Sequence, residues 1–286
     1  MLSMVVPLYI SEISPPEIRG VLLTLEELSI VTGIVIAFWI TFGTRYIQSE
    51  WAYRLPFLLQ VVPGIVLGLG ILLLPFSPRW LASQGRDQEA LQSLSRLRQL
   101  PTSDARVRQE WFDIRAEVEM HNVLYLERHP QQAKTHSRLR KEITGWMDCF
   151  GKGCWRRTHV GVGIMFFQQA VGINALIYYA PTLFRTMGLG HNAQLIWAGI
   201  LNVMQLVGVL TSLWTMDRYG RRTLLICGSA VMFVSHVVIA VLVGKFSYDW
   251  PSHRTQGWAS VAMLLVYMVA FGASWGPVPW ALPSEV

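Results

Sequence analysis

Long apolar runs, separated by short polar turns, dominate the pattern of hydrophobic and polar positions along this chain. Each run is long enough to cross a bilayer core of about 30 Å at about 1.5 Å of rise per helical residue. The runs are Val21–Gly43, Leu55–Pro75, Thr158–Phe184, Gln194–Met216, Thr223–Gly244 and Trp258–Leu282. The first ten residues lack the basic region of a signal peptide, so we interpret them as the last turns of a further spanning helix. The pattern predicts an all-α membrane protein with about six transmembrane helices.

The segment between the second and third runs is polar. It extends from Pro78 to Arg157, with helical periodicity over Arg86–Leu100 and Val107–Tyr125. We therefore expect a cytosolic helical domain with two spanning helices before it and four after it.

Composition and charge agree with this interpretation. The chain is 52% hydrophobic and 15% charged, which is typical of a multi-pass membrane protein. The net charge of +6 could suggest a nucleic-acid partner, but 15 of the 24 basic residues lie between Arg79 and Arg157, interleaved with 10 acids. Such a mixture is typical of a solvated segment, so we expect no nucleic acid.

The basic residues also predict the orientation. If Arg19, the polar segment and the DRYGRR loop at 217–222 share one side, that side holds 19 basic residues and the other side five. By the positive-inside rule the polar segment is cytosolic.

Two kinds of chemistry are disfavoured by the sequence. Cys149, Cys154 and His159 could hold a metal or form a bridge, but no second pair of ligands accompanies them, so we predict no metal site. No nucleophile and base occur at motif spacing, so we do not expect an enzyme.

One apolar run carries an unusual set of polar residues. The stretch FFQQAVGINALIYY at 166–179 contains two glutamines, an asparagine, two tyrosines and a glycine, within a run free of Asp, Glu, Lys and Arg. Amides in hydrocarbon need partners, and they suit a ligand rich in hydroxyl groups. The alternative is that the amides join neighbouring helices. We favour a polar ligand site on this helix.

Five motifs, taken together, resemble the sugar porter family of the major facilitator superfamily, and in particular the fungal-type hexose and monosaccharide transporters. They are PLYISEISPPEIRG at 7–20, PFSPRWL at 75–81, QQAVGINALIYY at 168–179, DRYGRR at 217–222 and GPVPWALPSE at 276–285. They occur in the family's order and spacing. The chain matches the family from the end of helix 4 to helix 10, and the family's first three helices, most of the fourth and the last two have no counterpart.

The resemblance implies three parts of the chain. Residues 1–77 are the second part of an N-terminal transmembrane lobe, 78–157 a cytosolic helical linker domain, and 158–286 the first four helices of the C-terminal lobe. The implied function is transport of a hexose or pentose by alternating access, either facilitative or coupled to a proton, in the plasma membrane. The implied partners are the monosaccharide and membrane lipid, with no cofactor beyond a co-transported proton.

The resemblance also implies the sugar-binding residues. They are Gln168, Gln169, Asn174, Gln205, Trp280 and Glu27. On a straight helix Gln168 and Asn174 would point about 240° apart, so we expect the helix to break or bend at Gly172 and Pro181. Counting back from the DRYGRR motif favours Gln205 on the next helix, with Asn202 as second choice.

Several of these positions carry alternatives or departures. Tyr178 and Tyr179 could gate the outer side or simply pack. Trp280 is expected to stack on the sugar ring. Glu27 stands where the family commonly has a glutamine, so it could bind sugar or take a proton. Gly272 replaces an acid that some members have.

Charges at the cytosolic helix ends are implied to form a conformational latch that pairs the two lobes. The latch residues are Glu12, Arg19, Arg79, Asp217, Arg221, Arg222 and Glu285. Phe76 departs from the family's PESPR pattern, where an acid stands. The alternative is a set of surface pairs worth about 0–1 kcal/mol each.

Two other functions remain in view. A non-transporting sugar sensor would have a long C-terminal tail, and none follows Val286. An inactive truncated transporter is the other, because alternating access needs two opposed lobes.

Overall fold

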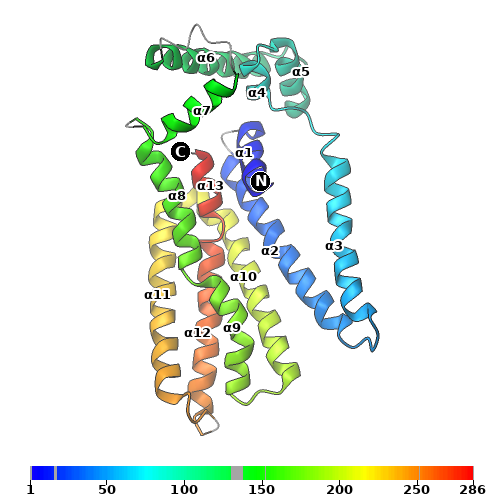
Figure 1. Cartoon of the computed structure of the whole chain (residues 1–286), viewed down its shortest axis with the longest axis vertical. Helices are drawn as coiled ribbons and strands as arrows, with labels where there is room; N and C mark the ends of the chain where they lie inside the picture. The colour runs from blue at the N-terminus through cyan, green and yellow to red at the C-terminus, as the bar shows by residue number, and fades with distance from the viewer. Residues whose placement is uncertain (1, 16–17, 130–137, 152, 251, 286) are drawn as a thin grey trace. The chain divides into compact units, whose positions relative to one another are not determined.

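The computed structural model describes residues 2–15, 18–129, 138–151, 153–250 and 252–285, with the backbone alone for residues 2–4, 138–142, 284 and 285. The described residues form helices and contain no strand, which confirms the predicted all-α class (Figure 1). Up to the polar segment the helices are α1 (Leu2–Ile13), α2 (Arg19–Thr44) and α3 (Trp51–Gly70). The polar segment forms α4 (Pro78–Ser83), α5 (Asp87–Arg98), α6 (Ala105–Arg128) and α7 (Arg138–Cys149). The remaining helices are α8 (Trp155–Ala170), α9 (Ile173–Thr186), α10 (His191–Tyr219), α11 (Arg221–Phe246), α12 (Arg254–Ala273) and α13 (Val278–Glu285).

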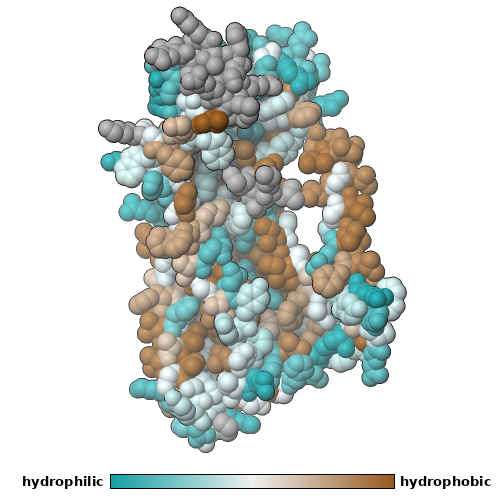
Figure 2. All heavy atoms as spheres, in the orientation of Figure 1, coloured by the Kyte–Doolittle hydropathy of each residue, from teal (hydrophilic) through white to brown (hydrophobic). Residues whose placement is uncertain are grey.

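Six segments among the described residues are long and apolar enough to cross a membrane, as the sequence predicts. They are α2, α3, α8 with α9, α10, α11, and α12 with α13. Two of the predicted runs are thus each divided into two helices. Figure 2 shows hydrophobic residues over α3 and α11, where a spanning helix would face lipid.

The chain forms two compact units. The first comprises residues 1–15 and 64–159, and the second comprises residues 16–63 and 160–286. The helix α2 therefore belongs to the same unit as the helices α9 to α13.

The first unit has a small core of its own. It is built from six buried side chains of α4, α5 and α6: Leu81, Ala82, Ala90, Leu94, Val107 and Ile114. Side chains cap two of the helices. The hydroxyl of Ser77 accepts from the Trp80 N–H at the start of α4, and the Asp104 carboxylate accepts from the Arg106 N–H at the start of α6. Hydrogen bonds from the side chain and backbone of Arg106 lower the pKa of Asp104.

The second unit is organised around α10, which packs against both α2 and α12. Its main core joins α9, α10, α11 and α12 through Phe184, Leu201, Met232 and Leu264, with Tyr267 completely buried among them. Figure 1 shows α9, α10, α11 and α12 running side by side in this unit.

Small residues set the close approach of α2 and α10. A side chain at Gly199 would meet the rings of Phe38 and Trp39, and one at Gly20 would collide with the Asp217 carboxylate. Glycine at both positions therefore lets the two antiparallel helices lie in contact at both ends.

The crossing of α10 and α12 is tighter still. A Cβ at Gly272 would collide with the carbonyl oxygen of Gln205, and a Cβ at Gly208 would collide with the Val269 carbonyl. The two glycines let the backbones touch, as small residues do at helix crossings in membranes.

This crossing yields a stability prediction. Replacing Gly272→Ala forces α12 away from α10, because the obstacle is backbone that has no rotamer to yield, and we expect about 1–3 kcal/mol of destabilisation. The measurement is the apparent unfolding midpoint of the detergent-purified chain, followed by tryptophan fluorescence.

The matched control is Gly33→Ala on α2, where a Cβ meets nothing within 4 Å. This variant should be neutral or slightly stabilised. A midpoint for Gly272→Ala equal to that of the control would contradict the close crossing.

Candidate functional site

The span formed by α8 and α9 is interrupted at Gly172. This glycine has φ of 91°, a left-handed conformation that L side chains rarely adopt, and α9 starts at the next residue. The break brings together two predicted site residues, because the Asn174 Nδ2 donates to the Gln169 Oε1 at 3.0 Å. Both side chains are exposed. The predicted interruption is confirmed at Gly172, whereas Pro181 lies inside the continuous helix α9.

A second break separates α12 from α13. The helix α12 ends at Ala273, and α13 begins after Trp275, Gly276 and Pro277. In a continuous helix the Trp275 carbonyl would accept from the N–H of residue 279, but that residue is Pro279, which has none. The sequence therefore leaves a carbonyl without its helical donor inside an apolar span.

Gln168 supplies the missing donor. Its Nε2 donates to the Trp275 carbonyl at 2.9 Å and to the Gly276 carbonyl at 3.2 Å. The side chain is 4% exposed, so the interaction is shielded from water. One glutamine at the end of α8 thus ties the first helix break to the second.

Glu27 reaches the second break from α2. It is 6% exposed. A Cβ added at Gly276 would lie 3.1 Å from the Glu27 Oε1, so the carboxyl group lies directly against this glycine. Gln168 and Glu27 therefore meet the same segment from two different helices. The neighbouring Glu26 is half-buried.

Two further amides lie one turn apart on α10. Asn202 and Gln205 are each 4% exposed. The Asn202 Oδ1 and the Gln205 Oε1 are buried and have no hydrogen-bond partner within the described part of the chain. Most buried polar atoms are hydrogen-bonded, so two adjacent free acceptors indicate a place for a ligand hydroxyl or water. Asn202 and Gln205 are thus alike in burial and in the lack of a partner for the side-chain oxygen among the described residues, although the sequence favoured Gln205 as the sugar-binding residue.

Aromatic residues near the two breaks differ in burial. Trp280 lies in the first turn of α13 and is half-buried. Tyr178 and Tyr179 on α9 are 77% and 70% exposed. Neither tyrosine packs into the core of this unit.

Sequence reasoning missed two residues that hold the first break. The Tyr267 hydroxyl donates to the Val171 carbonyl at 3.2 Å, and the His236 ring meets the Tyr267 ring edge to face with centroids 4.8 Å apart. The His236 Nε2 would lie 3.6 Å from a Cβ at Gly172. The only signal in the sequence is a lone tyrosine and a lone histidine within apolar runs, which does not reveal their partner.

The predicted latch residues of the second unit lie near the DRYGRR motif. Asp217 at the end of α10 and Arg221 at the start of α11 form an ion pair at 3.4 Å, and both side chains are partly exposed. Arg19 begins α2 next to Gly20, which packs against Asp217, and Arg222 is exposed.

The other latch residues lie elsewhere. Arg79 pairs with Glu117 of α6 at 3.2 Å, inside the first unit. Glu12 is half-buried on α1, and the side chain of Glu285 lies outside the described residues. A latch between lobes stays a prediction.

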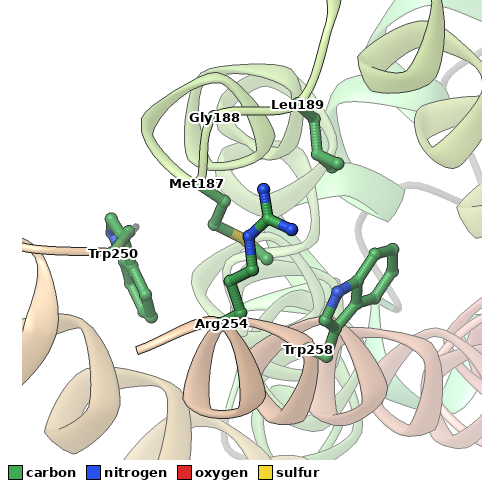
Figure 3. Close-up of a pocket in the computed structure, with 7 residues that line it drawn as sticks. Met187, Gly188, Leu189, Trp250, Arg254 and Trp258 are labelled. Atoms are coloured by element: carbon green, nitrogen blue, oxygen red, sulfur yellow. The ribbon is translucent and has the colours of Figure 1, made fainter. Parts of the chain in front are cut away.

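A small pocket of about 140 Å³ lies apart from the amides, between the end of α9 and the start of α12. Figure 3 shows Arg254 extending from α12 between Trp250 and Trp258, toward the turn at Met187 and Gly188.

The features above define a class of protein: a multi-pass helical membrane protein whose spanning segments break around buried amides. The chain belongs to the sugar (and other) transporter family, whose model matches residues 1–286. It is therefore an integral membrane protein.

Curated relatives are similar along nearly the whole chain. Sugar transport protein MST3 of Oryza sativa subsp. japonica is 34% identical over 284 residues, which is 98% of this chain and 51% of the relative. Sugar transport protein 13 of Arabidopsis thaliana is 34% identical over 282 residues, which is 98% of this chain and 49% of the relative. The chain spans about half the length of these relatives.

Solved structures show the same fold. The proton:xylose symporter XylE bound to 6-bromo-6-deoxy-D-glucose matches with a TM-score of 0.71 and 28% identity, over 99% of this chain and 54% of that one. A partially occluded inward-open XylE from E. coli matches with a TM-score of 0.65 and 26% identity, over 99% and 56%. Both are major facilitator proteins, so the chain carries part of that fold.

The support of the first break gives a prediction. Tyr267→Phe removes the hydroxyl that binds the Val171 carbonyl, and we expect about 0.5–1.5 kcal/mol of destabilisation because this half-buried acceptor loses its partner. The measurement is again the unfolding midpoint in detergent. The control is Tyr178→Phe, at an exposed position on α9, which should leave the midpoint unchanged. Equal midpoints for the two variants would show that the Tyr267 hydroxyl does not stabilise the fold.

Proposed function

We propose that this chain forms part of a transporter that moves a monosaccharide across the plasma membrane by alternating access. The observation that carries the proposal is the gathering of Gln168, Glu27 and the segment Trp275–Gly276 at a helix break inside an apolar unit. Two further groups of amide side chains in the same unit support it: the Gln169–Asn174 pair, and the Asn202 and Gln205 oxygens on α10, which have no partner among the described residues.

The chemistry of these groups suits a sugar. Amide side chains both donate and accept, and a pyranose presents hydroxyl groups that do the same. The free oxygens of Asn202 and Gln205 would accept from such hydroxyls, and their desolvation cost is recovered only when they do. The indole of Trp280 offers an apolar face to the apolar face of the ring. Gln168, Gln169, Asn174, Gln205, Trp280 and Glu27 make up the proposed site.

The helix breaks suit a mechanism of alternating access. A spanning helix that is divided in two can bend at the division while each half stays rigid, and transporters place substrate at such divisions. The Gly172 break and the Ser274–Pro277 break are linked through Gln168. We infer that a bend at one is transmitted to the other. The cytosolic charges, Asp217 with Arg221 among them, are proposed to pair lobe with lobe in one state and to part in the other.

The proposed transport could be facilitative or coupled to a proton, and we propose that it is coupled to a proton. A structural neighbour is named as a proton:xylose symporter, which supports coupling. In this chain Glu27 is the buried acid at the break, and a carboxyl group there either accepts from sugar hydroxyls or takes a proton.

The first prediction concerns binding. Gln168→Ala and Asn174→Ala should each weaken the Kd for D-glucose or D-xylose about tenfold, since each variant loses a proposed hydrogen bond to the sugar, and such a bond is worth roughly 0.5–1.5 kcal/mol. The measurement is scintillation proximity binding with the purified chain. Gln92→Ala, an exposed glutamine on α5 in the first unit, should bind like the parent. Equal losses in all three variants would refute the site.

The second prediction separates the roles of Glu27 and uses uptake in transport-null cells. The chain is compared with a chimera in which the rice relative MST3 supplies the helices that residues 1–286 lack. If Glu27 carries a proton, Glu27→Gln should abolish uphill accumulation and leave sugar counterflow intact, because the amide still accepts but does not titrate.

If Glu27 only binds sugar, the same substitution should change both measurements together. Uptake by neither the chain nor the chimera, in the presence of correctly inserted protein, would overturn the transport proposal.

A further inference from the structure

The helix α7 exposes an apolar stripe. Ile143, Trp146, Met147 and Phe150 are 60%, 69%, 70% and 67% exposed. The first three lie on one face of α7, since residues three and four apart are neighbours on a helix surface, and Phe150 directly follows the last residue of α7. Four large apolar side chains in a row are more than scattered surface positions, so the face calls for a partner.

The opposite face of α7 is already occupied. Asp148 lies about 140° around the helix from the middle of the stripe. Its carboxylate is 2.7 Å from the His129 Nε2, just after α6. The first unit thus holds α7 by its polar side, and the stripe is left without a covering element in the described part of the chain.

The end of α7 is fixed to the start of a spanning segment. The Thr158 hydroxyl donates to the Cys149 carbonyl at 2.6 Å, and the Trp155 N–H donates to the Gly151 carbonyl at 2.9 Å. Thr158 is in the first turn of α8, where the candidate membrane span Trp155–Thr186 begins. The stripe therefore ends five residues before the candidate membrane span begins.

The basic residues around α7 favour contact with an anionic surface. Between Lys134 and Arg157 the sequence has seven lysines and arginines against two acids. A basic segment next to a spanning helix is drawn to anionic phospholipid, and Trp is favoured at the level of the headgroups. A short helix with a basic surround and one apolar face is typical of an interfacial helix.

We propose that α7 lies on the membrane surface, on the basic side, with the stripe in the boundary between headgroups and acyl chains of a leaflet rich in anionic phospholipid. Its apolar face would enter that boundary by roughly 5–10 Å. Because the hydrogen bonds at Cys149 and Gly151 join α7 to α8, this contact would also set the depth of the first turn of α8 in the membrane. The proposal does not depend on sugar transport.

The test uses the full chain in lipid nanodiscs, with the three cysteines replaced by serine and a single spin label introduced. Labels at Ile143→Cys and Met147→Cys report the stripe, Gly145→Cys the opposite face, and Glu119→Cys on α6 a water-exposed reference. Collision with oxygen, which concentrates in lipid, is compared with collision with a water-soluble nickel chelate. In discs of phosphatidylcholine and phosphatidylserine we expect a higher ratio of oxygen to nickel accessibility for the stripe labels than for the other two.

The ratio for the stripe should fall when phosphatidylserine is omitted. Trp146→Asp should lower the ratio at Met147→Cys, whereas Phe112→Asp, at a 60% exposed aromatic on α6, should not. Stripe labels as accessible to nickel as the reference would overturn the proposal. Labels shielded from both reagents would also overturn it, by showing that protein, such as a second copy of the chain, covers the stripe. If the ratio of oxygen to nickel accessibility for the stripe labels is the same with and without phosphatidylserine, the proposed preference for anionic phospholipid is wrong.

Discussion

The hydrogen bonds from Gln168 to the carbonyls of Trp275 and Gly276 are the interaction on which the second unit depends. Backbone groups inside a membrane must be satisfied within the protein, because hydrocarbon offers no donors. Pro279 removes a donor from one span, and the glutamine of another span replaces it. The break between α12 and α13 is therefore possible only because α8 lies beside it, so the packing of these helices is part of the local backbone structure.

The same constraint explains why stability and the proposed site share residues. A polar group placed at a helix break serves the backbone when no ligand is present, and it is already held in a dry, apolar setting where a ligand would meet it. The Tyr267 hydroxyl does for the Gly172 break what Gln168 does for the other. Both breaks are therefore fixed by hydrogen bonds within the protein. At each break a side chain from another helix donates to backbone carbonyls: Gln168 to Trp275 and Gly276, and Tyr267 to Val171.

Much of this arrangement could be predicted from the sequence, because its causes are local. Runs of apolar residues gave the six spans, and the conflict between Gln168 and Asn174 on a straight helix gave the break near Gly172. The partners of those residues could not be predicted in this way. Gln168 and Trp275 are 107 positions apart, and their contact follows from how α8 packs on the break before α13. In the sequence, Tyr267 is one aromatic residue within an apolar run, and nothing near it indicates that its hydroxyl donates to the Val171 carbonyl.

Gly272 shows how a departure from the family pattern follows from packing. By resemblance some members have an acid here, yet in this chain even a methyl group would collide with the Gln205 carbonyl. The glycine lets α12 lie against the turn of α10 that carries the two buried amide oxygens. An acid at this position would hold the two helices apart and add a charge beside those acceptors. The close crossing instead keeps the Asn202 Oδ1 and the Gln205 Oε1 buried, with no hydrogen-bond partner among the described residues, and in the proposed site a ligand hydroxyl would donate to them.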